Sequence, residues 1–156
     1  MTGTLRIDIG QHSEAGRKPL NQDFHGAVVP KDALLATKGV VLALADGISS
    51  SPVSQVASAA AVRGFLEDYY VTSETWRVRG AAQRVLQATN SWLHAQTQRG
   101  EGRFDKNRGH VCTFSALVFK GREAHDVVGL GLLAEEWAAV RPAMADRLRA
   151  QGFEIA

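Results

Sequence analysis

The chain has 156 residues, of which 45% are hydrophobic and 22% are charged, as is ordinary for a single globular domain. Its 18 basic and 16 acidic residues form no basic block, which argues against a nucleic-acid or membrane-surface partner. No apolar run approaches the roughly 20 residues of a transmembrane helix, and the N-terminus lacks the apolar stretch of a signal peptide. The single cysteine, Cys112, fits a small buried hydrophobic residue in a reducing compartment, so we expect a cytoplasmic protein.

The first third of the chain predicts three strands. Residues 5–9 alternate apolar and polar side chains, which is the period of a half-buried strand. A polar loop should follow over residues 12–20, and a second strand over residues 23–29, ended by proline. The continuous apolar run 39–45, closed by Asp46-Gly47, indicates a strand that is buried on both faces.

Two long helices are predicted in the middle of the chain. Ser51-Pro52 is typical of a helix start, and apolar residues then recur at helical spacing to about residue 70. A second helix should occupy about residues 75–98. We expect the two helices to run antiparallel and to cover one sheet with Val56, Ala60, Leu86 and Leu93.

The last third mixes strand and helix signals. Residues 99–109 are charged and contain glycine, so they predict a mobile loop. Residues 111–119 are rich in strand formers, and a turn at 120–123 should lead into a short strand near 124–128. Residues 132–151 favour a helix interrupted by a proline. Strands and helices that are grouped rather than alternating indicate an α+β fold with one antiparallel sheet and the 39–45 strand at its centre.

Two short segments contain side chains suited to chemistry. In the first, a basic loop leads to Asn21-Gln22-Asp23 at the start of a strand. This pattern is common in turns that are closed by local side-chain hydrogen bonds, and it also fits a carboxylate presented at the end of a sheet.

The second segment is Asp46-Gly47, which leaves the apolar strand at its end. A carboxylate next to a free backbone carbonyl offers the oxygen ligands that Mg²⁺ and Mn²⁺ prefer. The same dipeptide is also common in tight turns. The later strand 111–119 contains no acid or base and fits a core strand by default.

Taken together, these segments resemble the 2C family of metal-dependent serine/threonine protein phosphatases. A basic residue with Asn21-Gln22-Asp23, then Ala45-Asp46-Gly47, then a strand bearing Thr113 occur in the order and approximate spacing of that family. The resemblance extends from Leu5 to His125. It is closest to the bacterial branch in which such a phosphatase domain is joined to a protein kinase domain.

The resemblance implies a fold, a metal site and a substrate. The fold would be an α-β-β-α sandwich, and the substrate a phosphorylated protein. Asp23 and Asp46 would be metal carboxylates, with Asp46 bridging two Mg²⁺ or Mn²⁺ ions and the Gly47 carbonyl binding one of them. Lys18 stands where the family usually has the arginine that binds the substrate phosphate, and Arg17 is the alternative.

The chain also departs from the family pattern. Ser49 and Ser50 replace a common Gly-Gly pair, and Ile48 stands where some members have a histidine. After His125 a Gly-Asp-Ser-Arg-like strand end should follow, but Leu130 occupies the aspartate position. The later Asp-Gly and Asp-Asn elements are missing from the sequence.

We therefore divide the chain into a truncated phosphatase domain, residues 1–125, and a divergent, mostly helical tail, residues 126–156. The second sheet of the sandwich should be incomplete. Two hypotheses follow, and whether the chain is an enzyme stays open between them. One is a metal-dependent phosphatase that is weak or inactive, and the other is a non-catalytic pseudophosphatase that binds phosphoproteins or a kinase. A nucleotide-binding domain is disfavoured because no glycine-rich phosphate-binding pattern follows a strand.

Overall fold

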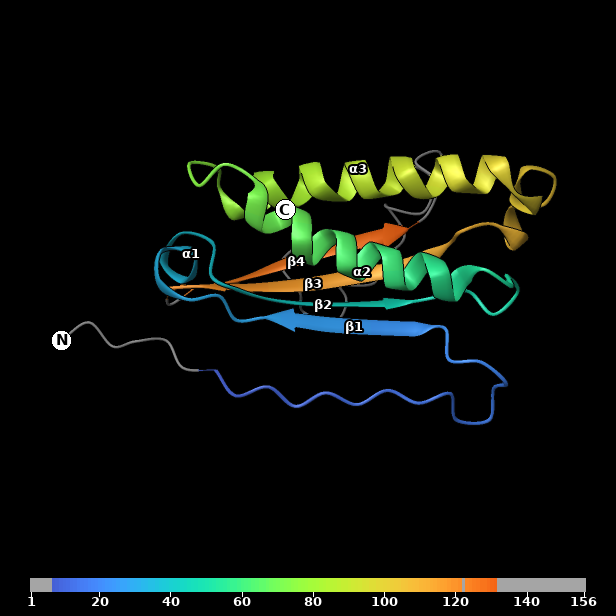
Figure 1. Ribbon diagram of the computed structural model, residues 1–156, viewed down its shortest axis with the longest axis horizontal. Helices are drawn as coiled ribbons and strands as arrows, with labels where there is room; N and C mark the ends of the chain where they lie inside the picture. Colours follow the sequence, from blue (N-terminus) through green and yellow to red (C-terminus); the bar gives the residue numbers. More distant parts are fainter. Residues whose placement is uncertain (1–6, 122, 132–156) are drawn as a thin grey trace, which may run out of the picture.

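The computed structural model describes residues 7–121 and 123–131, which form an α+β fold with one antiparallel sheet. The strands lie in the order β1-β2-β3-β4 (Figure 1), with bounds β1 Asp23–Val28, β2 Val40–Asp46, β3 Cys112–Lys120 and β4 Glu123–Gly131. The helices are α1 Asp32–Thr37, α2 Ser54–Val71 and α3 Val78–Arg99, followed by two short 3₁₀ turns, η1 Glu101–Arg103 and η2 Lys106–Arg108. The expected central position of the strand that ends at Asp46 is confirmed, because β2 pairs with β1 and β3.

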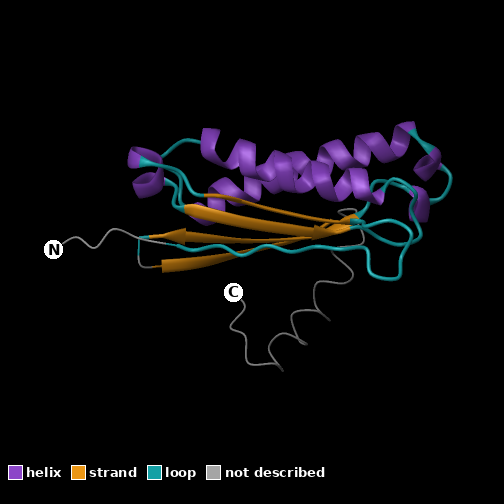
Figure 2. Cartoon of the chain, turned by 60° about the horizontal axis from the view of Figure 1, so that its bottom comes forward, coloured by secondary structure: helices purple, strands orange, loops and turns teal. Residues whose placement is uncertain are grey.

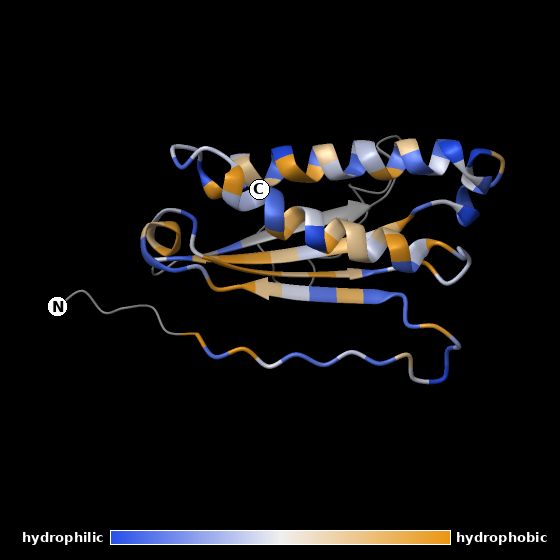
Figure 3. Cartoon of the chain, viewed as in Figure 1, coloured by the Kyte–Doolittle hydropathy of each residue, from blue (hydrophilic) through white to orange (hydrophobic). Residues whose placement is uncertain are grey.

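Both long helices cover the same face of the sheet (Figure 2) and run antiparallel to each other (Figure 1), as predicted. α2 lies over β1, β2 and β3, whereas α3 packs beside α2 and reaches β4. The inner strands β2 and β3 are predominantly hydrophobic (Figure 3). The core forms between the helices and this face of the sheet, and its largest aromatic members are Phe65, Tyr69 and Phe114.

The opposite face of the sheet has no covering helix among the described residues (Figure 2). β2 shows the consequence: Val41, Ala43 and Ala45 are buried against the helices, whereas Leu44 on the other face is 52% exposed. The prediction of a strand buried on both faces was therefore wrong. An apolar run cannot distinguish a strand covered on one face from one covered on both.

The helix faces also differ in part from prediction. Leu93 is buried and Leu86 packs against the core, but Val56 is 46% exposed. α2 begins at Ser54 rather than at Pro52, and its buried stripe is made of Ser54, Ala57, Ser58, Ala61, Val62, Phe65 and Tyr69. Small and hydroxyl side chains in the first two turns permit close packing of α2 on the sheet, so the buried stripe is shifted from Val56 and Ala60 to their neighbours.

The predicted strands at 23–29 and 111–119 and the hairpin after Lys120 are confirmed, with Gly121 at φ +64° in the turn. Of the strand predicted over residues 5–9, residues 5 and 6 lie outside the described residues, and the rest is not confirmed. Residues 7–10 are extended but belong to no strand, and they run on the side of the sheet away from the long helices (Figures 1 and 2). Ile7 and Ile9 are half-buried while Asp8 and Gly10 are exposed, so the alternation of burial occurs here outside any strand.

Residues 100–109 contain the two 3₁₀ turns, and Arg108 Nη2 lies 2.7 Å from Glu101 Oε2 across them. The boundary placed at residue 125 falls inside β4, so residues 126–131 continue the sheet. The helix predicted over residues 132–151 lies outside the described residues. None of the helices in the described part of the chain has the length and hydropathy needed to cross a bilayer.

Candidate metal centre

Asp23 and Asp46 are direct partners across β1 and β2. Directly opposed residues of antiparallel strands project from the same face, with Cβ atoms about 5 Å apart. This face is the one without helices, and both side chains are exposed. The structure thus brings Asp23 and Asp46, the two carboxylates that the resemblance implies for a metal site, together at one end of the sheet.

The two carboxyl groups interact electrostatically. Partial burial raises the pKa of Asp46 above its ordinary value, and both the hydrogen bond with Asp23 and the negative charge of Asp23 raise it further. The positive charge of Lys18 acts in the opposite direction and lowers the pKa of Asp46. The negative charge of Asp23 opposes the ionisation of Asp46, and a cation bound between the two carboxylates would remove this repulsion.

Gly47 holds the third predicted ligand, its backbone carbonyl. Gly47 N–H donates to the Gln22 carbonyl over 3.1 Å, and Ile48 N–H donates to the Val111 carbonyl over 3.4 Å. The C=O and N–H groups of a trans peptide point in opposite directions, so the Gly47 carbonyl points away from Val111, toward the side of β1.

Only glycine fits at position 47. A Cβ there would lie 2.9 Å from the Gln22 carbonyl oxygen and 2.9 Å from two carbon atoms of Ser54. This close approach of β1, the Asp46 loop and α2 is the structural reason for the glycine after the aspartate.

Gln22, which sequence reasoning missed as a functional residue, fixes this close approach. Its side chain is buried, and Nε2 lies 2.6 Å from Ser54 Oγ, 2.9 Å from the Ser51 carbonyl and 3.2 Å from the Ile48 carbonyl. Ser58 Oγ in turn donates to the Gln22 carbonyl over 2.6 Å. Gln22 therefore ties the start of β1 to the loop that carries Gly47. A polar residue within Asn-Gln-Asp gives no sequence signal that it will be buried.

Asn21 accepts a hydrogen bond from Asp23 N–H at Oδ1 over 3.0 Å. This is the local turn geometry that was the alternative interpretation of the Asn-Gln-Asp segment. The turn and the site are compatible, because the hydrogen bond uses the backbone of Asp23 and leaves its carboxylate directed at Asp46.

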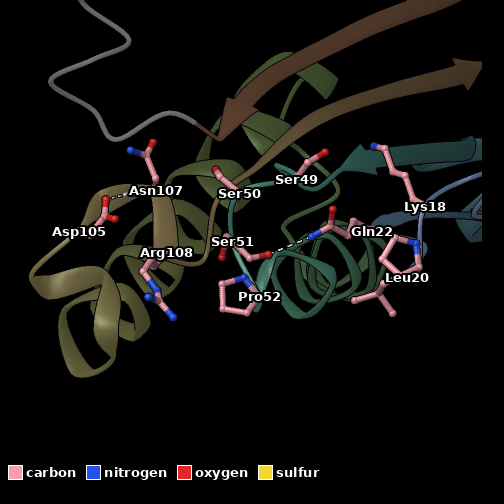
Figure 4. A pocket seen from close by; sticks show the side chains of 11 residues that line it. Lys18, Leu20, Gln22, Ser49, Ser50, Ser51, Pro52, Asp105, Asn107 and Arg108 are labelled. Carbon is pink, nitrogen blue, oxygen red and sulfur yellow. Dashed lines mark hydrogen bonds between the residues drawn. The ribbon is translucent and has the colours of Figure 1, made fainter.

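Arg17 and Lys18 lie in one turn, in which Lys18 N–H donates to the Ala15 carbonyl over 3.1 Å and Gly16 has φ +60°. Lys18 is close enough to Asp46 to affect the pKa of its carboxyl, and it lines an adjacent pocket (Figure 4). Arg17 is exposed and does not line that pocket. Of the two predicted phosphate-binding residues, Lys18 is the one that the fold places beside the carboxylates.

The row across the sheet continues from Asp46 to Thr113 on β3 and then to position 130 on β4. Asp46 N–H donates to Thr113 Oγ1 over 3.3 Å, and the backbone of Thr113 pairs with that of Leu130. The backbone of Leu130, the position at which the resemblance to the phosphatase family implies an aspartate, thus takes the fourth place in the row that begins with Asp23 and Asp46.

Two carboxylates and a backbone carbonyl fit one hard cation that keeps several water ligands. They do not complete a two-ion centre. Within residues 7–121 and 123–131, no group of three or more histidine, cysteine, aspartate or glutamate side chains is placed to hold a metal ion.

Comparison with known proteins adds no relative: no protein-family profile, curated protein or solved structure matches the chain.

Proposed function

We propose that this chain carries the site of a metal-dependent phosphoprotein phosphatase of the 2C type with an incomplete set of metal ligands. The observation that supports this proposal is the direct pairing of Asp23 with Asp46 beside the Gly47 carbonyl. The four-stranded sheet with its two helices would form one half of an α-β-β-α sandwich.

In this proposal Asp23, Asp46 and the Gly47 carbonyl hold one Mg²⁺ or Mn²⁺ ion. A bound divalent ion supplies Lewis-acid polarisation and a more acidic bound water. Lys18 provides a positive charge beside the carboxylates, and this charge attracts the phosphoryl group of a phosphorylated protein. Lysine acts there as a point charge and lacks the two-pronged geometry of arginine, which weakens the grip on phosphate.

A specific observation favours a second candidate, a non-catalytic protein that binds phosphoproteins or a kinase. Asp23 and Asp46 offer two negative charges, whereas two divalent ions bring four positive charges. Each missing carboxylate removes charge compensation and geometric constraint. On this ground we expect the chain to bind one ion weakly and to be a poor catalyst.

A metal-binding measurement tests whether the proposed metal site exists. Calorimetric titration of the purified chain with Mn²⁺ should give a dissociation constant of about 1 mM, the weak end of the range for oxygen-ligand sites. Asp46→Asn should abolish the signal, because it removes one of two carboxylates. Asp68→Asn on the exposed side of α2 is the matched control and should leave binding unchanged. Equal binding by wild type and Asp46→Asn would contradict the proposal.

A measurement of phosphatase activity distinguishes a metal-dependent phosphatase from a non-catalytic binding protein. We expect slow hydrolysis or none of p-nitrophenyl phosphate, even with millimolar Mn²⁺. A brisk Mn²⁺-dependent rate that disappears in Asp46→Asn would show a competent phosphatase and contradict the incomplete site. An equally brisk rate in Asp46→Asn would come from a contaminant.

A further inference from the structure

A pocket of about 560 Å³ opens next to the carboxylate pair. Three segments that are far apart in the sequence line it, namely residues 18–22, 49–52 and 105–108 (Figure 4). Its volume lies within the range of small-ligand sites, which run from about 300 to 1,000 Å³. Gln22 lines this pocket and directly precedes Asp23 in the chain. Lys18 also lines the pocket and affects the pKa of Asp46, so the pocket lies near the candidate metal centre.

Hydrogen bonds hold the three walls together. Gln22 Nε2 donates to the Ser51 carbonyl over 2.9 Å, and Ser51 Oγ donates to the Gly109 carbonyl over 2.7 Å. Ser51 thus links the start of β1 to the end of the turn that contains residues 105–108. Gly102 and Gly109 pack tightly against Thr97 at the end of α3, which anchors the same turn from its other side. The pocket is therefore preformed, and a ligand need not order its walls.

The charges in the pocket favour an anion. Lys18 stands on one wall and Arg108 on another, with the hydroxyl groups of Ser49 and Ser50 in a third segment (Figure 4). Asp105 is acidic, but its Oδ1 accepts the Asn107 N–H over 3.0 Å within its own turn. Arg108 is paired with Glu101 through Nη2, and a guanidinium has further N–H donors beyond the one such a contact uses.

The pocket also has apolar surface suited to a peptide. Leu20 is 44% exposed on its wall, and Pro19 and Pro52 lie beside it. An anionic peptide can place its backbone and aliphatic atoms against these residues while an acidic side chain reaches Arg108. A free phosphate ion would leave most of this surface unused.

We propose that this pocket binds the peptide segment adjoining the phosphorylated residue of a phosphoprotein, and that Arg108 selects an acidic residue in that segment. The inference rests on the proposed function, because it assumes that the phosphoryl group lies beside Lys18. It adds a preference for acidic flanking sequences, which the metal ligands do not provide.

Direct binding of labelled peptides tests the proposal. One set of phosphoserine peptides carries glutamate, glutamine or lysine at the positions flanking the phosphoserine, and a second set carries serine instead. Dissociation constants are measured by fluorescence anisotropy with EDTA present, so that neither metal binding nor hydrolysis enters. The wild-type chain should bind the glutamate peptide about fivefold more tightly than the glutamine peptide, as expected for one partly exposed ion pair.

Three variants test whether the charge of Arg108 causes the preference for the glutamate peptide. Arg108→Gln should reduce the preference for glutamate to less than about twofold, because the pair is lost. Lys106→Gln removes the same charge from the same turn at a position that does not line the pocket, and it should keep the preference. Glu101→Gln breaks the Glu101–Arg108 ion pair but keeps the guanidinium, so it should keep or increase the preference.

The outcomes distinguish failure of this inference from failure of the proposed function. Equal affinities of the wild type for the glutamate and glutamine peptides would overturn selection by Arg108. So would an equal loss of preference in Arg108→Gln and Lys106→Gln, which indicates general charge attraction, or in Arg108→Gln and Glu101→Gln, which indicates a structural role of the ion pair. A phosphoserine peptide that binds no better than its serine counterpart would instead contradict the part of the proposed function that places the phosphoryl group beside Lys18.

Discussion

An ionisable residue lies at each end of β2, and in both cases the pKa is shifted so that the neutral form is favoured. The environments of the two residues nevertheless differ. Lys38 lies just before the strand and is only 2% exposed, whereas Asp46 ends the strand in an exposed position. Burial lowers the pKa of Lys38, and the nearby Glu74 partly opposes this effect. Burial also raises the pKa of Asp46, but there a second carboxyl group adds to the shift.

At the Lys38 end, polar groups are matched with partners. Lys38 Nζ donates to Thr72 Oγ1 over 2.6 Å and to the Ser73 carbonyl over 2.8 Å, and it lies 5.5 Å from the centre of the Tyr69 ring. The Tyr70 hydroxyl lies 2.9 Å from the Gly39 carbonyl oxygen, with which it forms a hydrogen bond. These contacts attach the end of α2 to the start of β2, so this end of the sheet serves stability.

At the Asp46 end, polar groups of like charge face each other. The backbone there is as firmly held as at the other end, since Gln22 and Ser58 join β1 to α2. The carboxylates of Asp23 and Asp46 are nevertheless left to repel each other. Two like charges that are held close together by a fixed backbone are typical of a cation-binding site. The Lys38 end of β2 therefore contributes to stability, whereas in the proposed function the Asp46 end would bind the metal ion.

The largest expected effect is at the Lys38 end. Lys38→Ala removes the buried stem and leaves the Ser73 carbonyl without its donor, so the free energy of unfolding should fall by about 3 kcal/mol. Urea unfolding monitored by circular dichroism measures this change. Lys31→Ala, at an exposed site before α1, is the control and should change stability by less than about 0.5 kcal/mol. Similar values for the two variants would show that the buried lysine contributes no stability.

Sequence patterns predicted the elements of the described fold well where a periodic signal was long. The stretches that became β1, β3, α2 and α3 were each placed within a few residues, because apolar spacing and turn residues agreed locally. Residues 7–9 have the same alternation but belong to no strand, and strand pairing is a property of the whole fold. The exposure of Leu44 could not be predicted for a related reason, since coverage of a sheet face depends on distant segments.

The site was predictable only in its charged members. Asp23 and Asp46 stand at strand ends in the sequence, and the antiparallel register placed them opposite each other. The supporting contacts of Gln22, Ser51 and Ser58 were not predictable, because polar residues become buried only through partners far along the chain. Burial of Lys38 was missed for the same reason: a lysine after a short helix normally faces solvent.

An intermediate effect should follow from adding a ligand at the Asp46 end. Position 130 pairs with Thr113 in the row that contains Asp46 and Asp23. Leu130→Asp would add a third carboxylate to this row, and we expect Mn²⁺ affinity to rise about tenfold, equivalent to about 1.4 kcal/mol at the standard conversion. Calorimetric titration measures the change.

Two further variants make this result specific. Leu130→Asn has nearly the same shape without the charge, so it should raise affinity less than Leu130→Asp. Leu130→Asp combined with Asp46→Asn should return to weak binding, because the new carboxylate needs its neighbours. If Leu130→Asp leaves Mn²⁺ affinity at the wild-type value, the row across the sheet is not a metal site.

The smallest expected effect is an increase in the free energy of unfolding, caused by Asp23→Asn, whereas Lys38→Ala should lower it. Because the pKa of Asp46 is raised in the folded chain, its contribution to stability is present below the ordinary carboxyl value of 3.8 and is lost as pH rises through the folded-state pKa. Asp23→Asn removes the opposing charge, so part of that loss should be recovered near neutral pH. Both groups are exposed, which limits the gain to about 0.5 kcal/mol.

Urea unfolding in EDTA measures this gain as a function of pH. Asp23→Asn should be more stable than wild type at about pH 7, and the difference should disappear at about pH 3, where carboxyl groups are protonated and asparagine resembles them. Asp68→Asn should show no such pH-dependent difference. Saturating Mn²⁺ should reverse the order, because only the wild type gains stability from binding the ion. A gain that persists unchanged at low pH would mean that asparagine packs better at position 23, and the repulsion that marks this end of β2 as a cation site would have no energetic support.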